Sequence, residues 1–227
     1  MKKLTQTAIA TALIATPALA EDAAPPPYLM TEANTVTIAL TWTADSLEGL
    51  LPEGMEAVED RSGGINIYDA DEGFGLSPYS AAYAYVNVAG HDSDAGIPAR
   101  FILGGWYGPD PKVADAMNTH FAAGVSTGDS SQSEEGEEWT GTGGDDTGAI
   151  TLVVKPGDDC IASAATLNYV NARDDSLMQI PFEGDFCPAE PVSVDISGPD
   201  GSALAQLEVD AMLGGGRLRN GAFAFTK

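Results

Sequence analysis

The sequence predicts one β-rich α+β domain that folds as a closed or partly closed barrel. Many short segments alternate apolar and polar residues, which is the pattern of half-buried strands. Only two segments have the pattern of short helices. Hydrophobic residues make up 44% of the 227 residues, enough for a single core. Many short strands with few helices favour a barrel.

The first twenty residues have the pattern of a secretory signal peptide. Lys2 and Lys3 precede a short apolar run, and Ala18-Leu19-Ala20 is a small-residue cleavage site. We therefore expect cleavage near Ala20 and a periplasmic or secreted protein. The apolar run is too short to span a bilayer, and we expect no membrane span in the mature chain. Residues 21–33 are acidic and proline-rich, which predicts a flexible N-terminus before a single domain at 34–227.

The charge balance is strongly acidic, with 34 acidic against 10 basic residues and a net charge of -24. Nucleic-acid binding needs a cationic surface, so the composition excludes it as an expected function. Electrostatic docking to anionic lipids is disfavoured for the same reason. The acidity is more typical of a soluble protein than of one that recognises acidic ligands.

Two cysteines, Cys160 and Cys187, predict one structural disulfide in an exported chain. Their spacing is far from that of a redox pair. His91 and His120 form no ligand pattern with them, so we expect neither a metal site nor another cofactor.

The first half of the chain begins with a strand in which Val36 to Trp42 alternate with threonine and alanine. A later strand, 81–89, carries Tyr83, Tyr85 and Asn87 on one face and small apolar residues on the other. Its phenolic face suits either cross-strand packing or the wall of a polar-aromatic pocket. The other elements predicted here are a short helix at 45–51 and strands at 57–60 and 64–68.

Residues 100–124 carry the candidate chemistry. An apolar strand breaks at Gly104-Gly105, passes Trp106 and Tyr107, and leads into a helix with Asp110 at the N-cap and Gly124 as a stop. Lys112 lies just inside this helix, where the helix dipole favours the neutral amine. A neutral amine beside aromatic rings is a candidate nucleophile, whereas the alternative is an ordinary surface lysine.

The second half is predicted to contain strands and turns after an acidic, low-complexity loop at 124–148. This loop is expected to be solvated or to form a hairpin tip, and its dense oxygen atoms also allow calcium binding. The strands predicted after it are 150–154, 162–170, 177–182, 192–197, 204–209 and 221–225.

The order of these motifs resembles the acetoacetate decarboxylase family over most of the mature chain. The matching segments are 50–54 (LLPEG), 75–79 (GLSPY), 102–105 (ILGG), the Pro-Lys pair at 111–112, and the late GPDG turn at 198–201. The resemblance implies a cone-like β-barrel around an apolar cavity. It also implies a lysine that forms a Schiff base with a β-keto acid and thereby promotes loss of CO₂, and Lys112 falls on that position.

The chain departs from the family pattern at three positions. Val113 stands where a second lysine often follows the first, Ala33 where an arginine can hold a substrate carboxylate, and Ala81 near the place of a glutamate. These departures leave three functions open. The first is a secreted Schiff-base lyase that acts on a small keto acid or other carbonyl compound through Lys112. The candidate pocket walls are Trp106, Tyr107, Tyr79 and Tyr83.

The second function is a non-catalytic periplasmic binder of a small apolar or carbonyl ligand in the same cavity. The third is a structural or assembly protein of the envelope, with the acidic loop as its partner surface. Fold resemblance alone does not separate them. An enzyme needs the Lys112 amine inside a cavity, a binder needs the cavity only, and a structural protein needs neither.

Overall fold

The computed structural model describes residues 24–226; residues 1–20, on which the signal-peptide prediction falls, lie outside this range. Strands dominate the described chain. The helical elements are α1 (Pro111–Phe121), α2 (Ala203–Gln206) and the 3-10 turn η1 (Asp45–Leu47). The β-rich α+β class predicted from the sequence is confirmed. No helix among residues 24–226 is long and apolar enough to cross a membrane.

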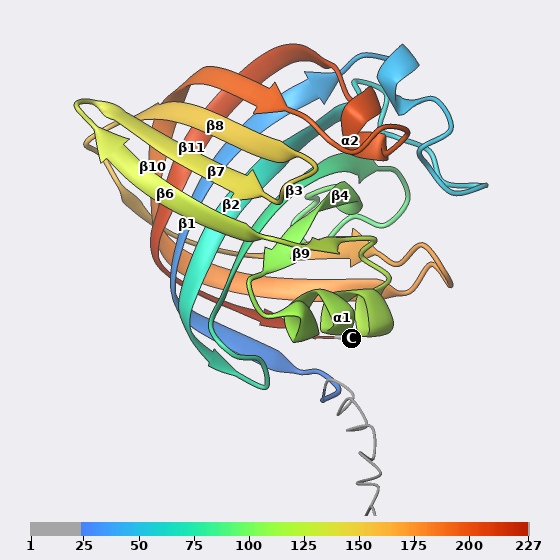
Figure 1. Cartoon of the computed structure of the whole chain (residues 1–227), viewed down its shortest axis with the longest axis horizontal. Helices are drawn as coiled ribbons and strands as arrows, with labels where there is room; N and C mark the ends of the chain where they lie inside the picture. The colour runs from blue at the N-terminus through green and yellow to red at the C-terminus, as the bar shows by residue number, and fades with distance from the viewer. Residues whose placement is uncertain (1–23, 227) are drawn as a thin grey trace, which may run out of the picture.

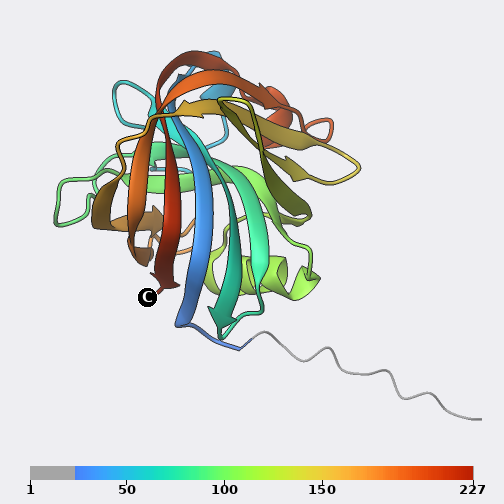
Figure 2. The same ribbon diagram turned by 90° about the vertical axis from the view of Figure 1, so that its left-hand side faces the viewer.

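Strands β11, β1, β2, β3, β4, β9 and β10 lie side by side in that order, and a pairing between β10 and β11 closes them into a barrel (Figures 1 and 2). Strands β8, β7 and β6 continue the sheet from β10. The strands are β1 (Tyr28–Trp42), β2 (Ser62–Phe74), β3 (Tyr79–Val88), β4 (Ala99–Gly108), β5 (Ser126–Thr127), β6 (Asp129–Glu135), β7 (Glu138–Gly144), β8 (Ala149–Pro156), β9 (Ile161–Val170), β10 (Leu177–Ile196) and β11 (Val209–Phe225).

Strand β10 belongs to both parts of the sheet. Its first half pairs with β9, its middle with β11, and its last residues with β8. The sequence predicted two separate strands here, because Pro188 and Pro191 interrupt the alternating pattern. The structure has one strand of 20 residues, which leaves the barrel and carries β8, β7 and β6 over its outer face.

The two faces of the barrel strands bury different side chains, because successive residues of a strand point to opposite faces. One face is aromatic: tyrosines such as Tyr68 and Tyr107 pack with Phe223 and with the buried side of α1. The other face is aliphatic: residues such as Ile38 and Ile67 pack against β8 and α2. The aromatic face holds the candidate site.

The N-terminal segment is more ordered than the sequence suggests. Residues 21–33 were expected to be flexible, but β1 begins at Tyr28. Tyr28, Met30 and Ala33 are fully buried in the aromatic core. The expectation is wrong for residues 28–33, where burial of apolar side chains outweighs the local proline and acidic content; residues 21–23 are outside the described range.

The acidic segment 124–148 also forms regular structure, as strands β5, β6 and β7. The hairpin of β6 and β7 packs on the aliphatic face of the barrel. A Cβ at Gly141 would collide with Val36 and lie 3.2 Å from Ile67 Cβ, so only glycine allows this close approach. Of the two predicted forms, the hairpin is confirmed and its tip at 133–137 is exposed, whereas an irregular loop is wrong for most of this segment.

Helix α1 begins as predicted and ends earlier. The Asp110 side chain accepts a hydrogen bond from the backbone N–H of Lys112 at 3.0 Å, and Pro111 occupies the first turn. The helix ends at Phe121, with Ala122 in the left-handed conformation at a φ of 52°. Gly124 was the expected stop. Residues 204–209, expected as a strand, contain most of α2 instead.

The disulfide between Cys160 and Cys187 is present, as predicted. It joins the segment between β8 and β9 to the middle of β10, where Cys187 is buried.

Candidate binding site

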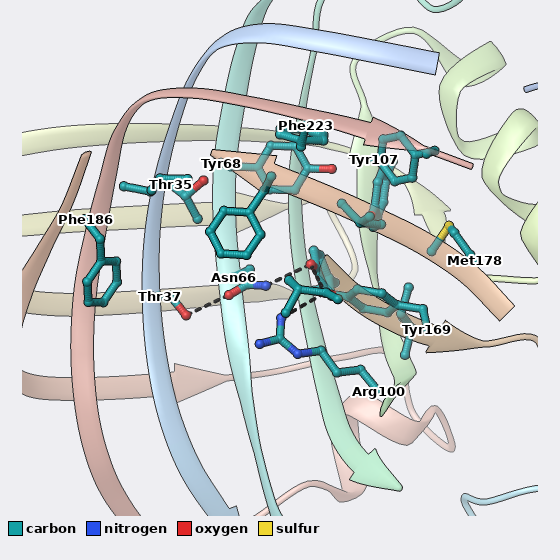
Figure 3. A pocket seen from close by; sticks show the side chains of 17 residues that line it. Thr35, Thr37, Asn66, Tyr68, Arg100, Tyr107, Tyr169, Met178, Phe186 and Phe223 are labelled. Atoms are coloured by element: carbon teal, nitrogen blue, oxygen red, sulfur yellow. Dashed lines mark hydrogen bonds between the residues drawn. The ribbon is translucent and has the colours of Figure 1, made fainter. Parts of the chain in front are cut away.

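A cavity of about 190 Å³ lies inside the barrel, on its aromatic face (Figure 3). Most of its wall is apolar, and its polar groups gather on strands β1 to β4 and β9. The lining residues are Thr35, Thr37, Asn66, Tyr68, Tyr83, Arg100, Ile102, Tyr107, Leu167, Tyr169, Met178, Ile180, Phe182, Phe186, Leu218, Phe223 and Phe225.

A row of hydrogen-bonded polar side chains crosses the first three of these strands. Thr37, Asn66 and Tyr83 stand directly opposite one another in the registers of β1, β2 and β3. The Thr37 hydroxyl donates to Asn66 Oδ1 at 2.7 Å, and Asn66 Nδ2 donates to the Tyr83 hydroxyl at 2.8 Å. Strand register therefore builds the row, because aligned residues on one face lie within reach of each other.

The row continues to β9 and β4 through Tyr169 and Arg100. The hydroxyls of Tyr83 and Tyr169 are 2.8 Å apart, and Arg100 Nη1 donates to the Tyr169 hydroxyl at 3.1 Å. The Arg100 guanidinium also stacks over the Tyr85 ring, with Cζ 4.2 Å from the ring centroid. Arg100 and Tyr169 form the one bridge pair recorded between β4 and β9. The polar row thus reaches the position where β4 meets β9.

Arg100 carries a permanent positive charge in the cavity wall. Desolvation disfavours the charged form, but interactions with Tyr85, Tyr169 and Tyr83 outweigh it, so the pKa of Arg100 lies above its usual value. A guanidinium does not lose its proton in a protein in any case. The side chain is partly buried, and Figure 3 shows its guanidinium among Asn66 and Tyr169 at the cavity.

The other tyrosines of the cavity remain neutral. Tyr68 and Tyr79 share a hydrogen bond of 2.8 Å between their hydroxyls, and Tyr79 and Tyr83 both stack on Tyr107. Burial raises the pKa of Tyr68, Tyr79, Tyr83 and Tyr107 well above the usual value, because a phenolate would lose its hydration. Tyr83, a member of the polar row, is therefore a neutral phenol.

The structure brings together two of the four pocket walls predicted from the sequence. Tyr83 and Tyr107 line the cavity. Tyr79 lies behind them, with its ring centroid 5.8 Å from that of Tyr107. Trp106 belongs to the aliphatic core on the other face of β4, because it precedes Tyr107 in the same strand and must point the opposite way.

Lys112 lies outside the cavity wall. It is exposed in the first turn of α1, whose buried face is formed by Val113, Ala114 and Met117, among others. Among residues 24–226, no lysine lines the cavity. A catalytic role for Lys112 stays a prediction.

Sequence reasoning missed three members of the polar row, Thr37, Asn66 and Tyr169, and gave Arg100 no role. A usable signal was present, since Asn66 stands between Ile65 and Ile67, and Arg100 precedes an apolar stretch. Such residues need a partner when buried. The partner itself could not be named, because it depends on the register of strands far apart in the chain.

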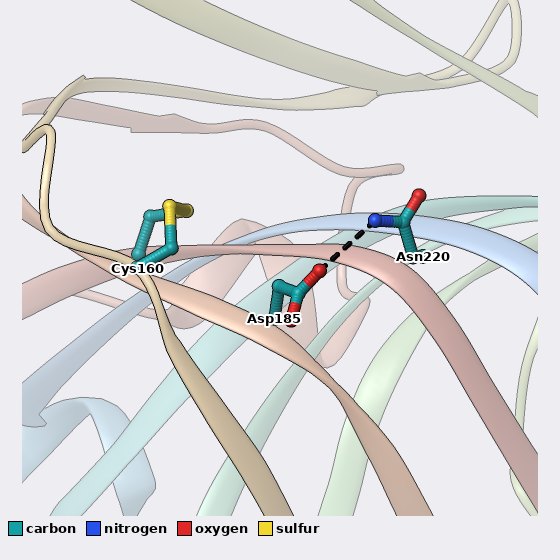
Figure 4. The surroundings of a disulfide bond; sticks show 4 residues. Cys160, Asp185 and Asn220 are labelled. Atoms are coloured by element: carbon teal, nitrogen blue, oxygen red, sulfur yellow. Dashed lines mark hydrogen bonds between the residues drawn. A yellow bond between two sulfur atoms is a disulfide. The ribbon is translucent and has the colours of Figure 1, made fainter.

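A second depression lies at Ala162–Ala164, Glu183–Asp185 and Asn220, near the disulfide (Figure 4). It is more open than the cavity. Asp185 accepts a hydrogen bond of 3.0 Å from Asn220, so these two polar groups are paired with each other. Nothing in this depression indicates a ligand.

Known structures share this fold. Acetoacetate decarboxylase from Legionella pneumophila superimposes with a TM-score of 0.63 and 13% identity, over 93% of this chain and 90% of that chain. The enduracididine biosynthesis enzyme MppR gives 0.62 and 12%, over 90% and 87%. An acetoacetate decarboxylase-like enzyme from Sphingomonas wittichii RW1 gives 0.55 and 14%, over 93% and 94%.

At the level of sequence, no family model and no curated protein matches the chain. The structural similarity nevertheless extends over almost the whole described domain. The chain has the acetoacetate decarboxylase-like fold, and the resemblance inferred from its motifs is confirmed at that level. Identities of 12–15% establish the fold alone.

Proposed function

We propose that the protein binds a small, largely apolar molecule inside the barrel and does not form a covalent bond to it through Lys112. The observation that supports this proposal is the cavity itself, with an apolar wall, one row of polar groups and no lysine among the described lining residues. Apolar cavities with a few convergent polar groups are the usual form of small-molecule sites.

The size of the cavity limits the ligand. A dry apolar cavity of about 150 Å³ is large enough to bind benzene. The present cavity, at about 190 Å³, accommodates a six-membered ring with one small substituent. The site therefore suits a compact molecule, and a long acyl chain or a dinucleotide does not fit.

A Schiff-base lyase is the second candidate, supported by the fold. The solved structures of MppR include a complex with pyruvate, a small carbonyl compound. Such chemistry needs an amine beside the bound carbonyl. Lys112 and Lys155 are both exposed, so they support this mechanism less well than the cavity supports binding. An envelope protein with a purely structural role would not need a cavity of this size.

The leader-like residues 1–20 support export, and we place the proposed binding in the periplasm or outside the cell. The Cys160–Cys187 disulfide favours the same compartment, because disulfides persist in oxidising surroundings.

Cavity filling tests the proposal. Leu218 lines the cavity on β11, and Leu213 on the same strand is 59% exposed. We expect wild-type protein to bind neutral ring compounds such as benzyl alcohol, measured by chemical-shift titration of the labelled mature chain. Leu218→Trp should abolish this binding, because the indole occupies the cavity. Leu213→Trp, the matched control, should leave it unchanged.

Two results would contradict the proposal. One is the absence of binding of any small ring compound to the wild-type chain. The other is equal binding by Leu218→Trp and Leu213→Trp, which would place the probe outside the cavity.

A further inference from the structure

We propose that the natural ligand is a small organic monoanion, whose oxyanion is held by Arg100 and by the tyrosine pair Tyr83 and Tyr169. This inference rests on the proposed function and specifies the ligand class. The site lies on β4 and β9, away from Lys112 and from the first strand. It requires no carbonyl group on the ligand.

The first argument is the number of free donors on Arg100. A guanidinium has five N–H groups. Only the bond from Nη1 to the Tyr169 hydroxyl is recorded for Arg100. Its Nε is buried and has no partner among residues 24–226. Uncommitted, partly desolvated donors of a cation are costly unless an acceptor is bound.

The pair of Tyr83 and Tyr169 has one phenolic proton more than its hydrogen bonds use. Asn66 donates to the Tyr83 hydroxyl and Arg100 to the Tyr169 hydroxyl. Tyr83 and Tyr169 together have two phenolic protons, and one of them forms the hydrogen bond between the two oxygens. The other proton has no acceptor in the recorded hydrogen bonds of the described chain. Whichever tyrosine carries it, the pair offers one further O–H donor.

Among residues 24–226, none of the groups that act most strongly on the Arg100 guanidinium is a carboxylate. The groups that raise the pKa of its guanidinium are the phenols Tyr85, Tyr169 and Tyr83. Burial raises the pKa of Tyr83 and Tyr85 above its usual value, so these two phenols stay neutral at ordinary pH. A partly buried cation without a counter-ion is a site where an anion is stabilised, and its planar N–H groups suit a carboxylate.

The apolar residues of the cavity wall indicate the chemistry of the uncharged part of the ligand, which is called its body below. Ile180 and Phe182 on β10 present apolar surface to the cavity, as do Met178 on β10 and Phe223 on β11 (Figure 3). The apolar wall adjoins the polar row, because Met178 stands opposite Tyr169 in the register of β9 and β10. An aromatic or branched aliphatic monocarboxylate fits both, with its charge at Arg100 and its body against β10 and β11.

Matched probes of one size test this inference. Benzoate, benzamide and benzyl alcohol have nearly the same volume, and only benzoate is charged at pH 7.5. We expect the wild-type chain to bind benzoate at least tenfold more tightly than benzyl alcohol, because hydrogen bonds to charged groups are the stronger ones. Chemical-shift titration gives the three dissociation constants.

Variants of Arg100 distinguish the contribution of its charge to binding from the contribution of the cavity. Arg100→Met should weaken benzoate binding at least tenfold and change benzyl alcohol binding less than about twofold. Retained binding of benzyl alcohol shows that the variant still folds around its cavity. Arg100→Lys should give an intermediate loss for benzoate, because it keeps the charge without the planar donors. Lys112→Met, the control that removes an exposed cation, should bind all three probes as the wild type does.

The outcomes distinguish the two proposals. The proposed anion site is wrong if the wild type binds benzyl alcohol as tightly as benzoate. It is also wrong if Arg100→Met keeps the preference for benzoate. In both cases the proposal that the cavity binds a small molecule is retained. If the wild type binds none of the probes, the anion site and the proposed function fall together. If Lys112→Met loses benzoate and Arg100→Met does not, the anion is held at the helix start.

Discussion

Strand β4 has a cation near each end, and the two are in opposite environments. Arg100, at its start, points to the cavity, stacks on Tyr85 and bonds to Tyr169. Lys112, just after its end, is exposed, and its backbone N–H donates to the Asp110 side chain. The sequence favours Lys112 as the chemical group, since it has the family motif. The fold places Arg100 at the cavity instead.

The difference between Arg100 and Lys112 shows that burial decides which cation can contact a ligand in the cavity. A cation enters a barrel only where neighbouring strands supply rings and acceptors for it. Arg100 has these partners because β4 meets β9 at Tyr169 and β3 at Tyr85. The start of α1 supplies an N-cap for its backbone and no pocket for a side chain.

The largest expected effect on stability concerns the backbone of β4 between the two cations, where it packs against Tyr83. Gly105 pairs with Tyr83 and has a φ of 153°; an added Cβ would lie 2.6 Å from Tyr83 Cα. Gly105→Ala should therefore lower the free energy of unfolding by about 2–4 kcal/mol. Gly214→Ala, where a Cβ meets nothing within 4 Å, is the control and should change it by less than about 0.5 kcal/mol. Urea denaturation measures both, and similar midpoints would contradict the close packing.

A pH titration tests whether the buried tyrosines of the aromatic core stay neutral in the folded protein. Burial raises the pKa of Tyr68, Tyr79, Tyr83 and Tyr107 above the value of about 10 that they have when unfolded. At high pH the folded chain therefore retains phenolic protons that the unfolded chain has already released. Their contribution to stability is complete below about pH 10 and is lost as the pH rises above it.

We expect alkaline unfolding, with most phenolate absorbance appearing together with the loss of circular dichroism. Of the seven tyrosines, the four named here should ionise only in that transition. Ionisation of all seven near pH 10 in a chain that keeps its folded spectrum would show that these rings are hydrated.

A smaller effect on stability is expected at the start of α1, next to Lys112. Asp110→Ala removes the N-cap of α1 and should cost about 1 kcal/mol of stability. Asp110→Asn keeps a capping oxygen and should cost much less. Benzoate affinity should be the same in both variants, because α1 begins outside the cavity wall. A loss of affinity in Asp110→Ala alone would connect the helix start to the site.

The smallest effect is expected for Lys112→Met, with a change in stability within about 0.5 kcal/mol. Borohydride reduction in the presence of pyruvate should give no adduct specific to Lys112, because the amine is exposed and does not line the cavity. Intact mass and peptide mapping measure this. A stable adduct at Lys112 that is absent from Lys112→Met would instead support the Schiff-base lyase.

Local sequence patterns predicted the elements that depend on neighbours in the chain. The Asp110-Pro111 start of α1 and the alternation that turns Tyr83 to one face of β3 are of this kind. Trp106 was misplaced because the motif was considered as a whole, although alternation already separates it from Tyr107. The order at Tyr28 and Met30 was missed because their burial depends on distant strands.

The polar row could not be predicted for the same reason. Thr37, Asn66 and Tyr83 meet because three strands align in register, and Tyr169 joins them through the single bridge between β4 and β9. The sequence indicates that a buried Asn66 needs a partner, but it does not indicate which residue supplies it. The function of these residues as one site follows from the pairing of their strands.

The most direct test is an experimental structure of the mature protein with benzoate. The account predicts one molecule inside the barrel, with its carboxylate at hydrogen-bond distance from Arg100 and from the hydroxyl of Tyr83 or Tyr169, and its ring against Met178 and Phe182. Benzoate bound beside Lys112, or bound in the cavity with its carboxylate turned away from Arg100, would contradict it.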